Sequence, residues 1–390
     1  MQVLADSNIP LVESLFSSLD SVSTFHTYSQ RQPSPAQLAD CDVLLVRSIT
    51  EVNAELLAQA PRLRFVGTAT IGTEHVDQMA LQQRNIAFAS APGANADSVA
   101  EYVLSCVLAL GGASIIDSQQ HVAIIGAGHT GRASGRRLQA LGLTVSYYDP
   151  PLLAQLQSTF CDSVKRQDLL AHDDWQQVLS ADIISCHVPL TQSGQHPTYH
   201  LFDADALAQL ATGTLFINAS RGAVVDNTAL RQRQQTPAAL KLALDVWESE
   251  PHVDACLANR VAIATPHIAG HSVEGKAGGG LSLYKAFCRW QKRACDVNLA
   301  DYLPAPISRQ WQWPEMPTAE QLQAAILSRY DVRDDHRWWQ QQGTRALSFD
   351  QARRDYATRQ RRQLACDRVL TRDAVVAERM QQLGFTVIAG

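Results

Sequence analysis

Residues 121–142, HVAIIGAGHTGRASGRRLQALG, place three glycines between an apolar run and a helical pattern. The glycines Gly126, Gly128 and Gly131 have the GxGxxG spacing of a dinucleotide-binding turn. The first allows a tight turn, the second lets the backbone approach a pyrophosphate, and the third permits close packing of helix on strand. Backbone amides and the helix dipole would hold the anion, and His129 is a further candidate for cofactor binding. This stretch therefore predicts a Rossmann-type unit.

An acidic residue follows at the spacing of an NAD-binding unit. Asp149 ends the next apolar run, 18 residues after Gly131. A carboxylate at that point accepts hydrogen bonds from ribose hydroxyls and repels a 2′-phosphate. Because no Arg or Lys follows it directly, NAD is favoured over NADP. The alternative is that Asp149 is a turn residue before Pro150.

Apolar runs of strand length alternate with helical patterns on both sides of the glycine turn. They cover residues 3–5, 43–46, 65–66, 86–89, 121–125, 145–148, 183–187, 215–218, 242–245 and 262–264. Strands that are apolar throughout indicate parallel sheets covered on both faces. Since four runs precede the glycine turn, we predict an α/β chain with two Rossmann-like, doubly wound parallel sheets.

Length and composition predict the domain boundaries. A chain of 390 residues exceeds what one hydrophobic core usually organises. We expect residues 1–96 with 269–293 to form a substrate-binding lid and residues 97–268 to form the NAD-binding domain. A proline-rich linker then introduces a third domain, 294–390, in which Arg, Gln and Trp are frequent. The basic run 353–363 is interpreted as a solvated helix, because nearby aspartates offset its charge.

Composition also excludes several classes of protein. An apolar share of 46% and a charged share of 18% are those of a globular chain. A net charge of -5 gives no broad positive field for nucleic acid or an anionic membrane surface. The first ten residues lack the basic and apolar segments of a signal peptide, and no apolar run is long enough to span a bilayer. With scattered cysteines, we expect a cytoplasmic protein.

Three later segments each follow an apolar run and carry one candidate catalytic residue. They are NASRGAVVD with Arg221, LDVWESEP with Glu250, and TPHIAGHS with His267. In an open parallel sheet, ligands bind beyond the carboxyl ends of the strands. Each residue alone has an ordinary explanation, as a surface cation, a turn carboxylate or a partly buried imidazole. We expect the three together to form an active site.

The three residue types match the dehydrogenation of a 2-hydroxy acid. Arg221 would bind the substrate carboxylate and carbonyl oxygen with its planar fork. His267 would take the hydroxyl proton as a general base, and Glu250 would fix its tautomer and stabilise the imidazolium. Asp245 lies on the same strand tip as the Glu250 segment and is expected to approach the nicotinamide end of the cofactor.

With these segments, the chain resembles the D-isomer-specific 2-hydroxyacid dehydrogenases over nearly its whole length. The stretches that carry the resemblance are VRSIT (46–50), FVGTATIGTEHVD (65–77), APGANADSVAEYV (91–103), RGAVVDNTAL (221–230), HIAGHSVEGK (267–276), LPAP (303–306) and YDVRDD (330–335). The resemblance implies NAD as cofactor, a small phosphorylated 2-hydroxy acid as substrate, and a C-terminal α+β domain that forms a homodimer.

The same resemblance implies further site residues. The backbone around Val188, Ala219, Ser220 and Gly270 would line the NAD site, and Arg221 would contact the cofactor as well. The substrate would be contacted by Ser48, Thr70 and His271, the last standing where the family has tyrosine. Arg47 is expected either to bind a phosphate or to form a structural salt bridge.

Three alternatives remain open at this point. The chain could act on 3-phosphoglycerate or another D-2-hydroxy acid, because the motifs do not define substrate length. It could instead be a corepressor-like protein that binds NAD(H) without turnover, since a fold does not define a function. His267 and His271 also form HxxxH, but Gly270 interrupts the helix and no third ligand is evident, so we expect no metal site.

Overall fold

The computed structural model describes residues 1–158, 171–342 and 346–389. Contacts divide the chain into two compact units. Unit 1 comprises Met1–Asn95 and Ser272–Ala305, and unit 2 comprises Ala96–His271 and Pro306–Gly390. Each unit is described separately below.

Unit 1 is built on a five-stranded parallel sheet with the order β2-β1-β3-β4-β5. This is the order of a flavodoxin-like doubly wound fold. Its strands are β1 (Gln2–Asp6), β2 (Thr24–Tyr28), β3 (Val43–Val46), β4 (Phe65–Thr68) and β5 (Ala87–Ala89). Its helices are α1 (Val12–Phe16), α2 (Pro35–Ala39), α3 (Ala54–Ala58), α4 (Gln78–Gln83), α12 (Val273–Trp290) and η4 (Leu299–Tyr302).

The long helix α12 belongs to unit 1 because its apolar side chains complete that unit's core. The ring of Phe287 packs on Phe16 at 5.2 Å and on Phe65 at 5.7 Å between centroids. Leu283 is also fully buried in this cluster. A segment that follows unit 2 in the chain therefore returns to complete the first sheet's core.

Unit 2 contains a seven-stranded parallel sheet with the order β12-β11-β10-β9-β6-β7-β8. Its strands are β6 (His121–Ile125), β7 (Thr144–Tyr148), β8 (Ala171–His172), β9 (Ile183–Cys186), β10 (Leu215–Asn218), β11 (Lys241–Leu244) and β12 (Ile263–Ala264). Helices of this part are α5 (Ala96–Gly111), η1 (Ala113–Ile115), α6 (His129–Ala140), α7 (Pro150–Ser158), α8 (Trp175–Leu179), α9 (Ala204–Gln209), η3 (Gly222–Val224), α10 (Asn227–Arg233) and α11 (Ala255–Ala258).

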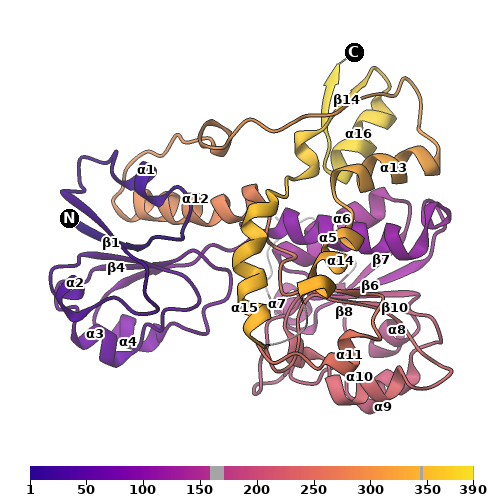
Figure 1. The fold of residues 1–390 in the computed structure, drawn as a ribbon, viewed down its shortest axis with the longest axis horizontal. Helices are drawn as coiled ribbons and strands as arrows, with labels where there is room; N and C mark the ends of the chain where they lie inside the picture. Colours follow the sequence, from indigo (N-terminus) through magenta and orange to yellow (C-terminus); the bar gives the residue numbers. More distant parts are fainter. Residues whose placement is uncertain (159–170, 343–345, 390) are drawn as a thin grey trace. The chain divides into compact units, whose positions relative to one another are not determined.

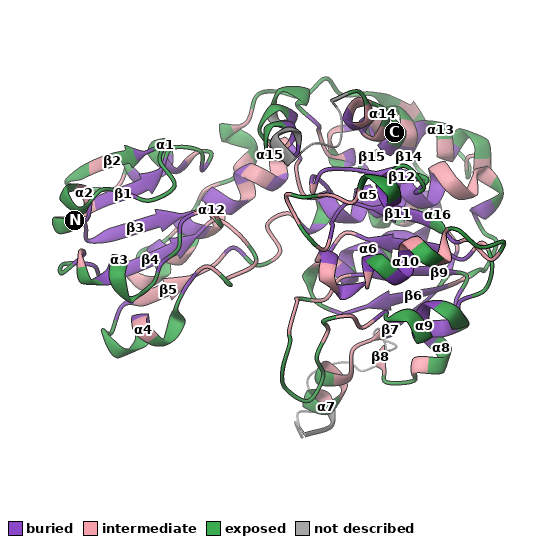
Figure 2. Ribbon diagram, turned by 60° about the horizontal axis from the view of Figure 1, so that its bottom comes forward, coloured by how far each residue is buried: buried purple, intermediate pink, exposed green. Residues whose placement is uncertain are grey.

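The strand order of unit 2 predicts where a ligand would bind. The chain winds outward from β6 to β7 and β8, then returns to β9 on the other side of β6. At such a reversal the loops after β6 and β9 diverge and leave a crevice. Figure 2 shows most of the sheet in purple, because helices cover both faces and bury it, whereas the edge strand β8 is only partly buried.

Residues 306–390 pack on unit 2 and contribute to its core. They contain β13 (Gln310–Gln312), α13 (Ala319–Arg329), α14 (Val332–Gln342), α15 (Ala346–Asp355), η5 (Tyr356–Arg359), η6 (Leu364–Cys366), β14 (Arg368–Thr371), α16 (Ala374–Leu383) and β15 (Thr386–Ala389). The strands form a parallel sheet, β13-β14-β15, and Figure 1 shows this part in orange and yellow. Leu322, Ile326 and Met380 share one hydrophobic cluster with Val103 of α5 and Ile124 of β6.

The predicted fold class is confirmed, with two differences in detail. The apolar runs missed β2, an edge strand with mostly exposed side chains, and the short strands β8 and β13 to β15. The prediction of a solvated helix over 353–363 is wrong for its second half. Helix α15 ends at Asp355, and Arg361 is only 7% exposed. The predicted dimerisation role of 294–390 stays a prediction. Among the described residues, no helix combines the length and apolarity that crossing a bilayer requires.

Glu101 provides a test of how the C-terminal residues pack on α5. Its carboxyl is 4% exposed and accepts the Leu364 amide at 2.8 Å. Burial raises its pKa from 4.5 to about 7, against the opposing charges of Arg137 and Arg361. Because the folded state then binds the proton more tightly than the unfolded chain, the stability from this group is full below pH 4.5 and is lost as the pH rises through 7.

We therefore expect Glu101→Gln to become more stable relative to the natural protein as the pH rises from 5 to 8. The amide oxygen of glutamine still accepts the Leu364 amide, so the variant isolates the ionisation. Urea unfolding at four pH values in this range measures the difference. A difference in unfolding free energy that stays constant with pH would contradict a raised pKa for Glu101.

Candidate active site

The glycine turn between β6 and α6 has the geometry that its spacing predicts. Gly126 has a φ of 95°, and a Cβ there would lie 2.9 Å from the His187 carbonyl oxygen. A Cβ on Gly131 would lie 1.9 Å from the carbonyl oxygen of Gly126. Both positions therefore require glycine, because backbone packs directly against backbone.

The surroundings of Gly128 are open. A Cβ on this residue would meet no atom within 4 Å, and α6 begins at the next residue, His129. The amides of a helix's first turn, together with its dipole, attract phosphate oxygens. A residue without a side chain keeps this backbone accessible, so the turn fits the pyrophosphate of a dinucleotide.

Asp149 shapes the same turn and keeps the capacity to bind a ligand. Its Oδ2 accepts the Ala127 amide at 2.8 Å, and its Oδ1 accepts the Leu152 amide at 3.0 Å. An ionised carboxylate has about four acceptor positions. Acceptor capacity is therefore left for the ribose hydroxyls of a nucleotide, and the negative charge disfavours a 2′-phosphate.

The loop that carries Arg221 directly follows β10 and is held by Asn218. The side-chain amide of Asn218 donates to the Arg221 carbonyl at 3.0 Å, and its oxygen accepts the Ser220 amide and hydroxyl at 3.1 and 2.9 Å. A Cβ on Gly222 would lie 2.0 Å from the Trp247 carbonyl oxygen. This close contact packs the Arg221 loop against the loop after β11.

Glu250 and His267 form a hydrogen-bonded pair at the ends of neighbouring strands. His267 Nδ1 lies 2.8 Å from Glu250 Oε2, and the Trp247 amide donates to Oε1 at 2.9 Å. Burial raises the pKa of Glu250, but His267 and the Trp247 amide outweigh it, and the pKa is lowered. The ionised carboxylate can only accept, so Nδ1 carries the proton and Nε2 is the nitrogen that can take one.

His267 has a left-handed backbone, with a φ of 58° that L residues rarely adopt. Asp245, which is 1% exposed, holds this turn. Its carboxylate accepts the Thr265 hydroxyl at 2.7 Å and the amides of Ile268 and Ala269 at 2.7 and 2.9 Å. Its carbonyl accepts the His267 amide at 2.7 Å. The surrounding hydrogen bonds therefore determine the strained conformation.

The remaining residues predicted for the cofactor lie in the loops of the same sheet. Val188 follows β9, Ala219 and Ser220 follow β10, and Gly270 follows β12. These loops lie at the carboxyl ends of their strands, as does the glycine turn. Contact of these residues, and of Asp245, with the cofactor stays a prediction.

The residues predicted to contact substrate are divided between the two units. Ser48, Thr70 and Arg47 belong to unit 1, and His271 ends a segment of unit 2. Arg47 forms the predicted salt bridge, with its Nε 2.9 Å from Oδ2 of the buried Asp6. The Thr70 hydroxyl donates to the Gly72 carbonyl at 2.8 Å. Substrate contact by these four residues stays a prediction.

Comparisons with known proteins agree with this geometry. Residues 115–269 match the family model described as "D-isomer specific 2-hydroxyacid dehydrogenase, NAD binding domain". A protein of Idiomarina loihiensis named erythronate-4-phosphate dehydrogenase is 45% identical over 389 residues, which cover 99% of this chain and 98% of that protein. The chain belongs to the D-isomer specific 2-hydroxyacid dehydrogenase family. It is an NAD-dependent oxidoreductase, and unit 2 contains its NAD-binding domain.

Other relatives and solved structures extend the comparison. The erythronate-4-phosphate dehydrogenase of Aeromonas salmonicida is 42% identical over 392 residues, with both chains fully covered. The D-lactate dehydrogenase of Aquifex aeolicus, solved with NAD and lactic acid, has a TM-score of 0.58 at 21% identity, covering 75% of this chain and 96% of that one. At this identity, the structure shows a shared fold.

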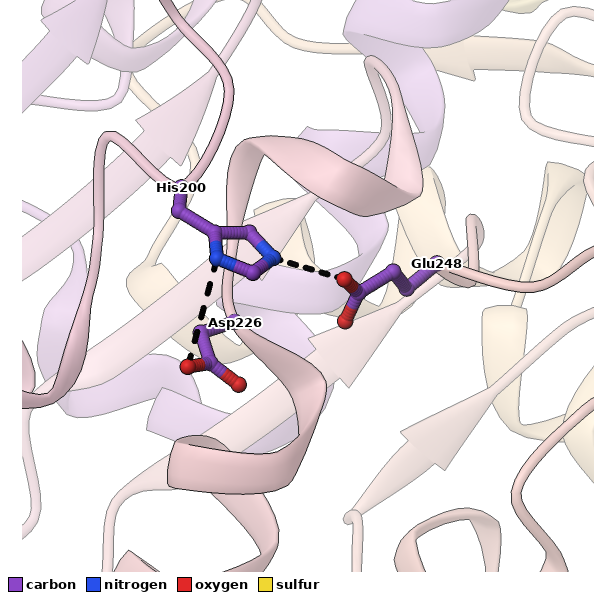
Figure 3. Close-up of side chains that lie close together, drawn as sticks. All are labelled: His200, Asp226 and Glu248. Carbon is purple, nitrogen blue, oxygen red and sulfur yellow. Dashed lines mark hydrogen bonds and ion pairs between the residues drawn. The ribbon is translucent and has the colours of Figure 1, made fainter.

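The sequence analysis did not identify a cluster of three side chains that lie close together, His200, Asp226 and Glu248 (Figure 3). His200 Nε2 is 2.6 Å from Glu248 Oε1, and Nδ1 is 4.0 Å from Asp226 Oδ2. The two ring nitrogens thus face different carboxylates. His200 therefore links the segment that carries Asp226 to the segment that carries Glu248.

The sequence analysis also missed the residues that hold the catalytic loops. Asn218 donates to the Arg221 carbonyl, and the Thr265 hydroxyl donates to Asp245. The Tyr102 hydroxyl forms a hydrogen bond with the Thr265 hydroxyl at 2.8 Å. Their only sequence signal is a polar residue at the end of an apolar run, as for Asn218. This signal is weak, because strand ends are often polar.

We expect Gly131→Ala and Gly128→Ala to separate folding from cofactor binding. At Gly131 the methyl group meets a backbone oxygen, so the variant should lose about 1–3 kcal/mol of stability. At Gly128 the methyl group has space but blocks the approach of phosphate, so stability should stay and NAD affinity should fall about tenfold. Thermal unfolding and NAD titration measure both. Equal behaviour of the two variants would refute this division of roles.

Glu250→Gln should lower kcat by about 10²-fold and leave NAD affinity unchanged. The Trp247 amide and His267 Nδ1 bond to different oxygens of Glu250. In glutamine one of these positions is an NH2 group, which cannot accept, so the imidazole loses its tautomer and orientation. Glu248→Gln is the matched control, since it changes a carboxylate two residues away that contacts His200. An equal loss of kcat in both variants would show that the loop, and not the pair with His267, is responsible.

Proposed function

We propose that this protein oxidises 4-phospho-D-erythronate at C2 with NAD as the hydride acceptor. The product is the 2-oxo acid, 2-oxo-3-hydroxy-4-phosphobutanoate, and the reaction is a step of pyridoxal 5′-phosphate (vitamin B6) biosynthesis. The observation that carries the proposal is the Glu250–His267 pair at the strand ends of an NAD-binding sheet. Full-length relatives named erythronate-4-phosphate dehydrogenase support the substrate.

The chemistry requires one base and one hydride acceptor. NAD, when bound, accepts the hydride from C2 and becomes NADH. His267 Nε2 takes the proton of the C2 hydroxyl, and the C–O bond becomes a carbonyl. Glu250 is ionised and accepts a hydrogen bond from Nδ1, so it stabilises the positive imidazolium that results. A positioned general base of this kind contributes roughly 10²- to 10⁴-fold in rate.

Arg221 is proposed to bind the substrate carboxylate and the oxygen at C2. Its Nη1 donates to the Ser220 carbonyl at 2.9 Å. A planar fork holds a carboxylate in one orientation, which lysine does not. This orientation places C2 for hydride transfer and stabilises charge on its oxygen.

Further contacts to the substrate are proposed for Ser48, Thr70 and His271. Ser48 is exposed and follows Arg47, whose terminal nitrogens remain as donors for a phosphate beside the Nε bond to Asp6. His271 can donate to a phosphate oxygen where the family has tyrosine. We also propose a cytoplasmic location and a homodimer formed through residues 294–390.

A comparison of substrates tests the proposal. We expect kcat/KM for 4-phosphoerythronate to exceed that for 3-phosphoglycerate by at least about tenfold, a difference of 1.4 kcal/mol in transition-state binding. NADH absorbance measures turnover, and a His267→Asn variant is the control for chemistry at this site. Preference for 3-phosphoglycerate would assign another substrate in the family. Firm NAD binding without turnover of any 2-hydroxy acid would favour a binding protein.

A further inference from the structure

The C-terminal segment, defined as residues 306–390, contacts the loops that carry the proposed catalytic residues of its own chain. The segment lies outside residues 115–269, which match the family's NAD-binding domain, but it belongs to the same compact unit. The catalytic loop is defined here as residues 267–271, which follow β12. Arg361 contacts this loop, His336 contacts β12, which leads into it, and Trp339 contacts the loop that carries Glu250.

Arg361 contacts the catalytic loop directly. Its Nη1 donates to the Ala269 carbonyl at 2.9 Å, and its Nη2 donates to the Ser98 carbonyl of α5 at 2.5 Å. The same Ala269 residue donates its amide to Asp245 at 2.9 Å. Ala269 is therefore held from two sides, by a carboxylate at the end of β11 and by a guanidinium of the C-terminal segment. His267 lies two residues earlier.

The surroundings of Arg361 hold its guanidinium in one place. Its central carbon lies 3.7 Å from the centroid of the Tyr330 ring. Asp335, 2% exposed, accepts the hydroxyls of Tyr330 and Tyr356 at 2.8 and 2.6 Å. The buried cation thus faces an aromatic ring and interacts electrostatically with the buried carboxyl of Asp335, an arrangement that offsets part of its desolvation. Such a network positions the donor more tightly than a solvated side chain would.

His336 of α14 contacts the strand that leads into the catalytic loop. Its Nδ1 accepts the Ala264 amide of β12 at 3.0 Å. Because β12 is the edge of its sheet, the imidazole takes the position that a further strand would occupy. Burial lowers the pKa of His336, which keeps the ring neutral and Nδ1 able to accept.

Trp339 of α14 contacts the loop that carries Glu250. Its fully buried indole lies 5.5 Å from the indole of Trp247, centroid to centroid. The amide of Trp247 is the donor to Glu250 Oε1. The C-terminal segment therefore contacts the loop of His267 at Ala269, and it contacts Trp247, whose amide bonds to Glu250.

We infer that Arg361 is a positioning residue, which fixes the catalytic loop through the Ala269 carbonyl and so places His267 for proton transfer. The C-terminal segment then contributes to catalysis within its own subunit, in addition to any role in assembly. This inference rests on the proposed function for its kinetic readout. Displacement of a catalytic group by about 1 Å can cost about 10²-fold in rate, so a small shift of this loop has a measurable effect.

Arg361→Lys is the test, with Arg359→Lys as the matched control. Lysine keeps the buried charge but loses the fork that reaches two carbonyl oxygens. Arg359 lies in the same segment, 3.2 Å from Asp335 and over the Trp338 ring, and both of these contacts are with α14. We expect Arg361→Lys to lower kcat by about 10- to 100-fold. KM for NAD should change by less than about twofold, and Arg359→Lys should keep kcat.

Two further readouts separate positioning from loss of structure. With substrate deuterated at C2, Arg361→Lys should show a larger isotope effect on kcat than the natural protein, because the chemical step becomes slower than product release. Hydrogen exchange in residues 265–271 should also be faster in Arg361→Lys than in Arg359→Lys, and this measurement needs no substrate. A loss of kcat that follows melting temperature equally in both variants would overturn the inference.

Two variants of His336 provide a second test in case Arg361→Lys does not fold. His336→Asn retains an oxygen that can accept the Ala264 amide, whereas His336→Leu removes the acceptor. We expect kcat to fall in His336→Leu and to be largely restored in His336→Asn, with equal NAD affinity in both. Equal kcat in the two variants would overturn the inference. If even the natural protein fails to turn over 4-phosphoerythronate, the proposed substrate fails, while the exchange of residues 265–271 still decides the positioning role.

Discussion

The carboxylate of Asp245 is the interaction on which the proposed active site depends. The backbone amide of Asp245 donates to the Asn218 carbonyl, and its backbone carbonyl accepts the His267 amide. Its two side-chain oxygens accept three hydrogen bonds from the segment after β12. A buried carboxylate without such partners would cost several kcal/mol. The segment after β12 therefore folds so that its donors reach the carboxylate. Asp245 connects the ends of β10, β11 and β12 through these hydrogen bonds.

Around this centre, rigid elements hold loops that would otherwise be mobile. Backbone packing at Gly222 sets the Arg221 loop against Trp247, and the left-handed backbone of His267 persists because its neighbours are hydrogen-bonded. Loops placed on a stable sheet are the common location of catalytic groups. The C-terminal segment adds to the same support, since Arg361 and His336 bond to the backbone on either side of His267.

Much of the fold could be predicted from local patterns, and the same patterns supplied the candidate site residues. The GxGxxG turn, the acidic residue after the second strand, and the apolar runs of β3, β6, β9 and β10 depend on neighbouring residues alone. Edge strands were missed because an exposed strand such as β2 lacks an apolar run. The basic run from residue 353 was interpreted as solvated, yet Arg361 is buried. Its burial could not be predicted locally, because the tyrosines and the aspartate around it belong to other elements.

The sequence by itself determined the parallel α/β class, the nucleotide turn and the identity of the three candidate catalytic residues, because each of these is set by residue type and short-range spacing. The tertiary structure alone decided that Glu250 bonds to Nδ1 of His267, that Asp245 and Arg361 both hold Ala269, and that His200 bridges two carboxylates. These contacts join residues from 17 to 92 positions apart, and pairing at such distances depends on how strands and helices pack, which local patterns do not encode.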